Sequence, residues 1–279
     1  MISIGITGHK GVIGSEFIKR NNNFNFVPFI GDITRKKNVD DWIKSNSFQI
    51  LLHFAAVTET QEAENNFSRV KKVNYNGTKN LVDSIINHQP NNLVYFFYAS
   101  TSHVYKASNK KIGESSKKLP ITRYGLTKLI AENYILKRKK YTHVKFCIGR
   151  VFSFMHYKQK PTSFIQAVYR KIYVQNKKHI FFSGLHQYRE VLGSKDVCEA
   201  ISFLCKKKVT GIYNIASGKK TKLLKIVKIL KGKEKIRIIT DQGKEQNLIA
   251  NIEKIKKLGW TPKQNIHQVL NEYLKNKNR

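Results

Sequence analysis

The pattern of hydrophobic and polar residues predicts alternating strands and helices through the first half of the chain. An alternating segment at 2–7 precedes a glycine-rich turn, after which a helix begins. Continuous apolar runs at 48–56 and 92–100 have the length of strands that are covered on both faces of a parallel sheet. Further strands are expected within 24–33 and 143–152, and further helices within 73–88 and 124–140. This order predicts an α/β fold with a Rossmann-type doubly wound parallel sheet.

The pattern loosens beyond residue 152. A short strand at 211–216 is expected to return to the sheet, after a helix that begins at residue 194. We therefore expect a sheet domain at 1–152 with a return segment near 193–215. The remaining residues, 153–279, are expected to form mainly a smaller, mostly helical part over the carboxyl ends of the strands, where such sheets bind ligands.

Composition and cysteine usage indicate an ordinary globular chain. It has 279 residues, 41% of them hydrophobic, and no apolar run approaches the roughly 18 residues of a membrane span. The N-terminal segment is too short and too glycine-rich to be a signal peptide. Three cysteines make no disulfide framework, and Cys198 and Cys205, seven apart on an expected helix, are predicted to face the core. We expect a cytoplasmic protein with no membrane partner.

The net charge of +34, from 52 Lys and Arg against 18 Asp and Glu, is unusually high. Such a field attracts nucleic acid, anionic lipid and phosphorylated small molecules alike. The lysines are spread along the whole chain beside many Asn and Ile, a mixture that an AT-rich coding sequence also produces. The charge alone identifies no partner, and no specific nucleic acid is predicted.

Three glycines, Gly8, Gly11 and Gly14, lie between the first strand and the first helix. Glycines occur in turns of every kind, so the spacing alone is weak. In this context, however, the backbone N–H groups of the turn are placed to meet a pyrophosphate at the helix N-terminus. The turn therefore predicts a bound dinucleotide.

A second motif places Tyr124 and Lys128 four residues apart on one helix face. An isolated pair of this kind is usually a feature of a surface helix. Here the hydroxyl-rich segment 98–105 follows a buried strand, and a hydroxyl, a phenol and an ammonium beside a nicotinamide form a hydride-transfer site. We expect Lys128 to lower the pKa of Tyr124 from about 10 by its charge.

Several segments together resemble one family. They are "TGHKGVIG", "GDI", "HFAA", "VNYNGTKNL", "STSHVY", "YGLTK", "GRVF", "YREVLGSKDVCEAI", "YNIASG" and "LGWTP". In these the chain resembles the extended short-chain dehydrogenases/reductases, and within them the NAD-dependent epimerase/dehydratase enzymes that act on nucleotide sugars. The resemblance covers nearly the whole chain, and implies that 1–152 is an NAD(P)-binding domain.

The resemblance implies a role for each matching residue. Tyr124 is the acid/base, Lys128 binds the nicotinamide ribose, and Thr101 is the catalytic hydroxyl. Arg189 pairs with a substrate phosphate, unless it is a surface arginine, and Thr101 and Ser102 also meet the substrate. The remaining cofactor-binding residues are Gly8, Lys10, Gly11, Val12, Ile13, Gly14, Asp32, Ile33, Ala55 and Ala56.

The chain also departs from the family. Ser102 and His103 stand where sugar-nucleotide dehydratases carry an Asp-Glu pair, so dehydration is not expected. Lys106 replaces the glycine usual after "VY", and the segment that follows Arg150 alters the lid over the sugar, which leaves the substrate open. No metal is expected. The histidines His9, His53, His143 and His179 do not have the spacing of metal ligands.

Lys10 inside the glycine turn favours NADP over NAD. The turn resembles the "GHRG" form of the nucleotide-sugar reductases that make GDP-fucose, in which the basic residue reaches the 2′-phosphate. No acid precedes Asp32 to hold the ribose hydroxyls of NAD, and Arg35 or Lys36 is placed to assist Lys10. The alternative is that Lys10 is one more lysine in a lysine-rich chain and that the cofactor is NAD.

We therefore predict an NAD(P)-dependent nucleotide-sugar ketoreductase in the synthesis of glycan precursors. The main alternative is a nucleotide-sugar C4 epimerase that retains its NAD. A further alternative is a decayed member that senses NADP or binds nucleic acid, against which the intact Thr101, Tyr124 and Lys128 argue. The resemblance also suggests a homodimer formed through a four-helix interface.

Overall fold

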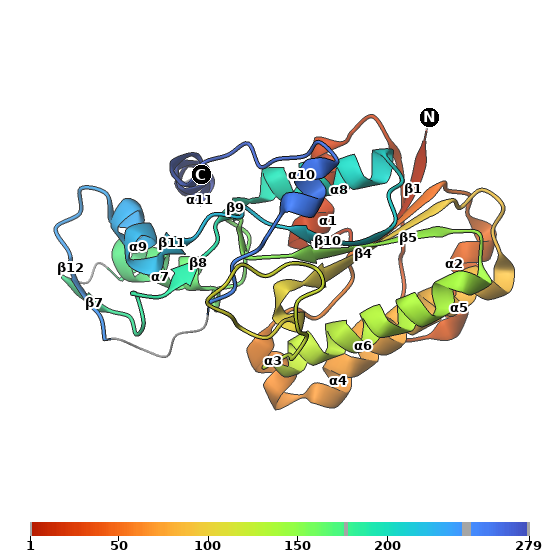
Figure 1. The fold of residues 1–279 in the computed structure, drawn as a ribbon, viewed down its shortest axis with the longest axis horizontal. Helices are drawn as coiled ribbons and strands as arrows, with labels where there is room; N and C mark the ends of the chain where they lie inside the picture. The colour runs from red at the N-terminus through yellow and green to blue at the C-terminus, as the bar shows by residue number, and fades with distance from the viewer. Residues whose placement is uncertain (1, 176–177, 242–246, 278–279) are drawn as a thin grey trace. The chain divides into compact units, whose positions relative to one another are not determined.

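The computed structural model describes residues 2–175, 178–241 and 247–277, which divide between two compact units (Figure 1). The first unit comprises Met1–Lys106, Glu114–Val151 and Cys198–Ile215. The second comprises Ala107–Gly113, Phe152–Val197 and Ala216–Arg279.

A six-stranded sheet organises the first unit, with the strand order β10-β5-β4-β3-β1-β2. Every neighbouring pair is parallel. The strands are β1 (Ser3–Thr7), β2 (Asn25–Pro28), β3 (Ile50–His53), β4 (Tyr95–Thr101), β5 (Lys145–Val151) and β10 (Gly211–Ile215). All residues of β3 and β4 are buried, as continuous apolar runs predict. The Rossmann-type sheet is confirmed, and β10 pairs with β5 at its edge.

Helices cover both faces of this sheet. On one face α2, α5 and α6 pack with side chains of β3, β4 and β5 in a single apolar core. On the other face Phe17 of α1 and Cys205 of α8 lie near Ile4 and Leu52 of the strands. The helical segments are α1 (Val12–Arg20), α2 (Lys36–Ser45), α3 (Thr60–Asn65), α4 (Phe67–Lys71), η1 (Lys72–Asn76), α5 (Gly77–His88), η2 (Ser102–Val104), α6 (Arg123–Arg138), η3 (Lys139–Tyr141) and α8 (Ser194–Lys206).

The second unit has its own apolar core, built largely from α7, α9 and α11. Its helical segments are α7 (Phe164–Tyr169), η4 (Arg170–Val174), α9 (Leu223–Lys231), α10 (Glu253–Lys257) and α11 (Ile266–Lys277). The described strands of this unit form two-stranded sheets that pair β6 (Phe154–Met155) with β9 (Leu192–Gly193), β8 (Tyr188–Arg189) with β11 (Thr221–Lys222), and β7 (His179–Phe181) with β12 (Arg237–Ile239).

The cysteines behave as the spacing predicts. Cys147, Cys198 and Cys205 are buried and form no disulfide bond, and burial raises the pKa of the Cys198 thiol to about 12. In the three described ranges no helix is both long enough and apolar enough to cross a membrane.

Candidate active site

The glycine turn joins β1 to α1 at the carboxyl end of β1. Gly8 has a φ of +71°, and a Cβ at this position would lie 2.5 Å from the amide nitrogen of Ala55. The amide of Gly11 donates to the carbonyl of Gly8 over 2.9 Å, and α1 begins at the next residue, so that Val12, Ile13 and Gly14 form its first turn. Gly11 has no side chain to cap α1. The first N–H groups of this helix are therefore left to bind an anionic group.

A buried histidine, His53, is hydrogen-bonded to the residue that precedes this turn. His53 Nδ1 lies 2.7 Å from Thr7 Oγ1, and His53 Nε2 lies 2.9 Å from Thr78 Oγ1. Thr7 Oγ1 also accepts the N–H of Ala55 over 3.2 Å. Burial, aided by the charge of Lys128, holds the pKa of His53 well below its usual value, so the ring is neutral. His53 thus links β1, β3 and α5 under the predicted cofactor site.

Asp32 follows β2, at the point where the adenine end of a dinucleotide is expected. Its carboxylate accepts two hydrogen bonds from Thr34, from the amide N–H over 2.9 Å and from the hydroxyl over 2.8 Å. These bonds lower the pKa of Asp32. Arg35 Nε lies 3.8 Å from the same half-exposed carboxylate, and Ile33 is buried beside it. Asp32 is therefore a fixed anion at this edge of the sheet.

The basic residues considered for an extra phosphate differ in their surroundings. Lys10 is exposed in the glycine turn. Arg35 faces Asp32, while the Lys36 ammonium donates to Asp40 over 2.5 Å. Lys36 is therefore already paired with an acid one helical turn away. Of these basic residues, Lys10 is the one that lies in the glycine turn.

Thr101 and Tyr124 meet in the structure. Thr101 is the last residue of β4 and is buried, and Tyr124 lies in the first turn of α6. Burial raises the pKa of Tyr124 to about 12, and a hydrogen bond with the Thr101 side chain partly opposes this rise. The expected lowering by Lys128 is wrong for this structure, because removal of the phenol from water outweighs other effects.

Lys128 lies one turn after Tyr124 on α6 and is only 3% exposed. Its Nζ lies 4.1 Å from the centre of the Tyr98 ring, over the aromatic face. Burial lowers the pKa of Lys128 to about 7, although the negative charge of Glu132 acts in the opposite direction. Near neutral pH the ammonium is therefore poised between its two charge states.

The start of α6 packs tightly against the segment after β4. Thr122 Oγ1 accepts the N–H of Gly125 over 3.0 Å and so caps the helix. A Cβ on Gly125 would lie 2.2 Å from the carbonyl oxygen of His103, so only glycine permits this approach. The His103 ring meets the Tyr124 ring edge-on at 5.7 Å, and Ser102 is buried beside it.

Asn74 belongs to the site region although no role was assigned to it from the sequence. Its side chain accepts the N–H of Val57 over 2.8 Å and donates to the carbonyl of Val57 over 2.9 Å. It also donates to Thr127 Oγ1 over 3.0 Å. Asn74 therefore ties the loop that carries the half-buried Ala55 and Ala56 to α6. In the sequence it lies in the segment "VNYNGTKNL", which could have pointed to it.

Arg189 lies in β8 of the second unit, and its role stays a prediction. Its guanidinium donates to the carbonyl of Tyr188 over 3.0 Å and to Gln187 Oε1 over 3.1 Å, and burial lowers its pKa. The neighbouring Glu190 was overlooked in the sequence. Its carboxylate accepts the N–H groups of Ala250 over 2.7 Å and Ser217 over 3.1 Å. These two bonds fix the end of β8, next to Arg189.

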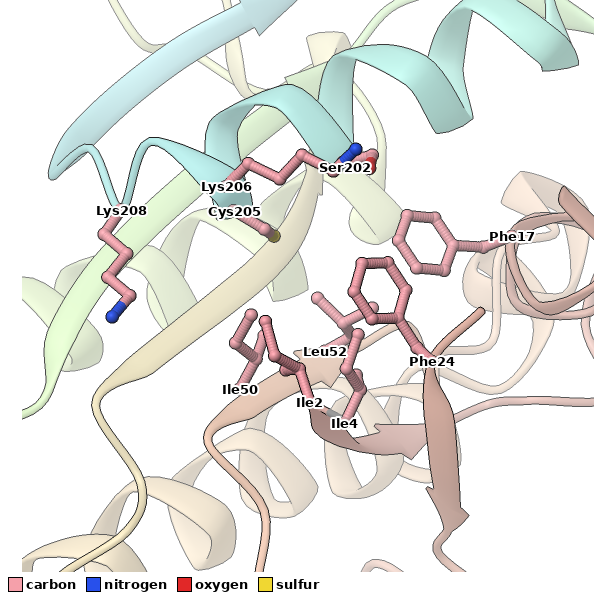
Figure 2. Close-up of a pocket in the computed structure, with 10 residues that line it drawn as sticks. All are labelled: Ile2, Ile4, Phe17, Phe24, Ile50, Leu52, Ser202, Cys205, Lys206 and Lys208. Atoms are coloured by element: carbon pink, nitrogen blue, oxygen red, sulfur yellow. The ribbon is translucent and has the colours of Figure 1, made fainter. Parts of the chain in front are cut away.

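A cavity of about 130 Å³ in the first unit lies elsewhere. It is lined by Ile2 and Ile4 of the β1 region, Phe17 of α1 and Cys205 of α8, among others (Figure 2). None of the predicted site residues lines it, so it does not belong to the candidate active site. Within the described residues no three His, Cys, Asp or Glu side chains are placed to hold a metal ion.

Comparison with solved structures agrees with the fold. RMD from Pseudomonas aeruginosa, complexed with NADPH, superposes with a TM-score of 0.91 at 20% identity, over 100% of both chains. UDP-glucose 4-epimerase from Thermotoga maritima, with UDP-glucose, gives 0.86 at 20% identity, also over 100% of both chains.

Comparison with sequences identifies the family. Human dTDP-D-glucose 4,6-dehydratase is 29% identical over 267 residues, which cover 89% of this chain and 73% of the human protein. The sequence profile of the NAD dependent epimerase/dehydratase family matches residues 4–216. The chain therefore belongs to the NAD dependent epimerase/dehydratase family, whose members are NAD-dependent epimerases and dehydratases of the short-chain dehydrogenase/reductase type.

Proposed function

We propose that the protein is an NADP-dependent nucleotide-sugar ketoreductase. The observation that carries this proposal is the meeting of Thr101 and Tyr124 at the carboxyl end of β4, with Lys128 one turn further along α6. A hydroxyl and a phenol at the end of a sheet strand form the acid/base half of a carbonyl reduction.

The residues of the chain have distinct tasks in this reaction. With its pKa near 12 the Tyr124 phenol is protonated at neutral pH, the state from which it donates a proton to the oxygen of a keto sugar. Thr101 orients that oxygen and the phenol. The charged form of Lys128 favours the tyrosinate that remains after proton transfer and holds the ribose of the cofactor. When bound, NADPH would supply the hydride.

Features of the turn and of the second strand support NADP. The cradle around Gly8 fits a pyrophosphate, and Lys10 is exposed within it. After β2 the carboxylate of Asp32 is already bound by Thr34 and faces Arg35. At this edge of the sheet Asp32 is thus already hydrogen-bonded and lies near the cation Arg35. It is therefore not a free acid for the ribose hydroxyls of NAD. Among the similar structures, RMD contains NADPH and the Thermus thermophilus UDP-glucose 4-epimerase contains NAD, so the preference is argued from the residues of this chain.

The substrate is proposed to be a nucleoside-diphosphate keto sugar. Arg189 suits a phosphate because a guanidinium binds two oxygens at once. Ser102 and His103 offer no carboxylate beside Thr101 for the elimination of water, and this argues against a dehydratase.

A C4 epimerase is the second candidate, since the Thermotoga maritima neighbour is a UDP-glucose 4-epimerase. A retained NAD would then accept hydride from one carbon and return it to the same carbon, with Tyr124 acting first as base and then as acid. Such an enzyme consumes no cofactor overall.

One experiment separates the two. The purified protein is incubated with NADPH and a panel of nucleoside-diphosphate 4-keto sugars, and separately with UDP-glucose in the absence of added cofactor. A ketoreductase consumes NADPH in a one-to-one ratio with the alcohol formed. Interconversion of UDP-glucose and its C4 epimer without net cofactor change would support the epimerase and overturn the reductase.

A further inference from the structure

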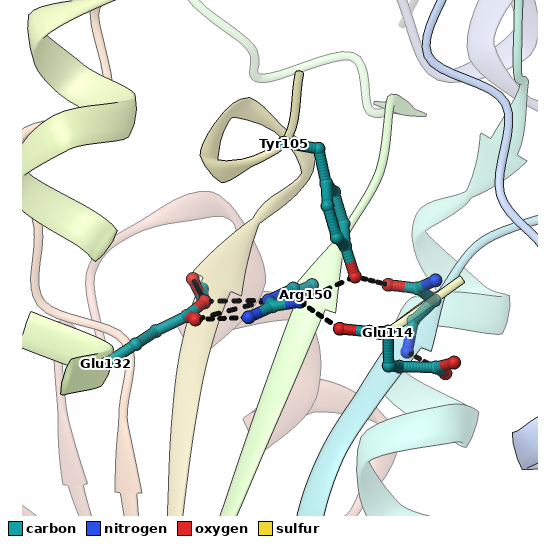
Figure 3. Close-up of polar contacts among 6 residues, drawn as sticks. Tyr105, Glu114, Glu132 and Arg150 are labelled. Atoms are coloured by element: carbon teal, nitrogen blue, oxygen red, sulfur yellow. Dashed lines mark hydrogen bonds and ion pairs between the residues drawn. The ribbon is translucent and has the colours of Figure 1, made fainter. Parts of the chain in front are cut away.

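A buried ion pair lies beside the predicted catalytic residues (Figure 3). Glu132 of α6 and Arg150 of β5 are both fully buried. Arg150 Nε lies 3.0 and 3.2 Å from the two carboxylate oxygens of Glu132, and the terminal Nη2 lies 2.6 Å from Oε2. Buried charges persist only when they are paired and hydrogen-bonded, so the two residues depend on each other.

The Glu132 carboxylate connects the catalytic helix to the catalytic strand. Glu132 lies one helical turn after Lys128 and two turns after Tyr124 on α6. It also accepts a hydrogen bond from the hydroxyl of Ser100, the residue before Thr101 in β4. A single carboxylate therefore fixes the elements that carry the three predicted catalytic side chains.

Arg150 is held from its opposite side. Its Nη1 donates to the Tyr105 hydroxyl over 2.7 Å and to the carbonyl of Glu114 over 2.9 Å (Figure 3). The Tyr105 hydroxyl donates in turn to Asn214 Oδ1 over 2.7 Å. These bonds fix the guanidinium, so the position of Glu132 does not depend on a flexible partner.

The charge of Glu132 also acts on Lys128. The other titratable groups around this ammonium are Tyr98 on β4, His53 on β3 and Tyr124 on α6. His53 is held neutral by burial, and burial raises the pKa of both phenols, so these groups are uncharged near neutral pH. Of the groups named here, Glu132 is the one that opposes the loss of the Lys128 proton.

We propose that Glu132 is a positioning residue of the hydride-transfer site, which holds the Thr101 end of β4 against α6 and places a negative charge one helical turn from Lys128, with Arg150 as its fixed counter-ion. The catalytic consequence rests on the proposed function. The electrostatic consequence is a property of the folded chain and is tested without substrate.

The test is an NMR titration of the whole protein labelled with ¹³C at lysine Cε, with the Lys128 signal assigned through Lys128→Met. In Glu132→Gln the Lys128 pKa is expected to fall by at least about one pH unit relative to the wild type, because the neighbouring negative charge is lost. Glu114→Gln is the matched control. Its carboxylate accepts the N–H of Asn214 in the same network, and the Lys128 pKa is expected to stay unchanged.

Glu132→Gln leaves Arg150 buried without its ion pair, so a second variant guards against misfolding. In Glu132→Leu with Arg150→Met the pair is replaced by apolar side chains, a change that folded proteins commonly accept. This variant also removes the positive charge of Arg150, so the Lys128 pKa is expected to fall less than in Glu132→Gln. An unchanged Lys128 pKa in folded Glu132→Gln, or a pKa that falls as far in the double variant as in Glu132→Gln, overturns the proposal.

Activity measurements separate this inference from the proposed function. If the wild type reduces a keto sugar, loss of activity with rising pH is expected to occur at lower pH in Glu132→Gln, by the same interval as the Lys128 pKa. A wild type without reductase activity whose Lys128 pKa still depends on Glu132 would refute the function alone. An active wild type whose Lys128 pKa ignores Glu132 would refute the inference alone.

Discussion

The Lys128 ammonium lies 4.1 Å from the centre of the Tyr98 ring, in the interior of the first unit. An aromatic face attracts a cation, but it replaces only part of the hydration that the ammonium loses. The fold therefore accepts a cost in stability to keep this cation at the predicted site, as is common where function requires it.

Replacement of Lys128 with methionine is expected to stabilise the protein while it removes activity. The usual lysine pKa of 10.5 falls to about 7 in the fold. Between these values the unfolded chain binds more protons than the folded one, so stability rises with pH, and the burial cost is full below pH 7. Lys128→Met should gain on the order of 1–3 kcal/mol near neutral pH, and the gain should shrink towards pH 10.5.

Denaturant unfolding of the wild type and Lys128→Met at several pH values measures this difference. A variant that is less stable than the wild type at every pH would contradict the burial of a costly charge at this position.

Gly125→Ala is expected to disturb the site through sterics alone. The added Cβ would lie 2.2 Å from the His103 carbonyl and would force η2 away from α6. We expect a loss of about 1–3 kcal/mol in stability and at least about tenfold in turnover. The control is Gly113→Ala, because no atom lies within 4 Å of a Cβ at Gly113. Equal effects of the two substitutions on turnover and thermal stability would show that the contact is unimportant.

Lys10→Ala tests the choice of cofactor. A lysine–phosphate contact at an exposed site is worth on the order of 1–2 kcal/mol, or roughly ten- to thirtyfold in affinity. The variant should lose about this factor for NADPH and almost nothing for NADH, in calorimetric titrations. Lys19→Ala, at an exposed lysine in the last turn of α1, should leave both affinities unchanged. Equal losses for both cofactors in Lys10→Ala would assign Lys10 to the shared pyrophosphate.

The charge of +34 is expected to produce only unspecific association with DNA. Scattered lysines bind phosphates and do not read bases, so binding to duplexes of different sequence should be equal and should weaken steeply with salt. Fluorescence anisotropy over a salt series measures both properties. A salt-resistant complex that prefers one sequence would revive the nucleic-acid-binding alternative.

The strands of the sheet were predictable from the sequence, but α2 was not. The buried positions of α2 are Val39, Trp42 and Ile43, set among charged and polar residues, so its apolar periodicity is short. Its stability comes from tertiary packing, in which Trp42 meets Phe29 and Phe48 at ring distances of 5.3 and 4.9 Å. Contacts of this kind are not readable from a local pattern.

The motif spacing brought out Tyr124 and Lys128, and the family resemblance added Thr101. The structure does bring Thr101 and Tyr124 together. The direction of the Tyr124 pKa could not be read from spacing, because it depends on burial in the folded chain. The pairing of Glu132 with Arg150 was hidden for a similar reason. Glu132 lies on α6 and Arg150 on β5, and only the packing of that helix on the sheet brings the two charges together.

The most direct test of the central claim is the kcat of Tyr124→Phe with NADPH and a keto-sugar nucleotide, measured beside the affinity for NADPH. The phenol carries the proton and contributes little to the binding of the dinucleotide. We predict a kcat lower by about 10²–10⁴-fold, with an NADPH affinity within about twofold of the wild type. A variant that keeps more than about a tenth of the wild-type kcat would contradict the assignment of Tyr124 as the acid/base.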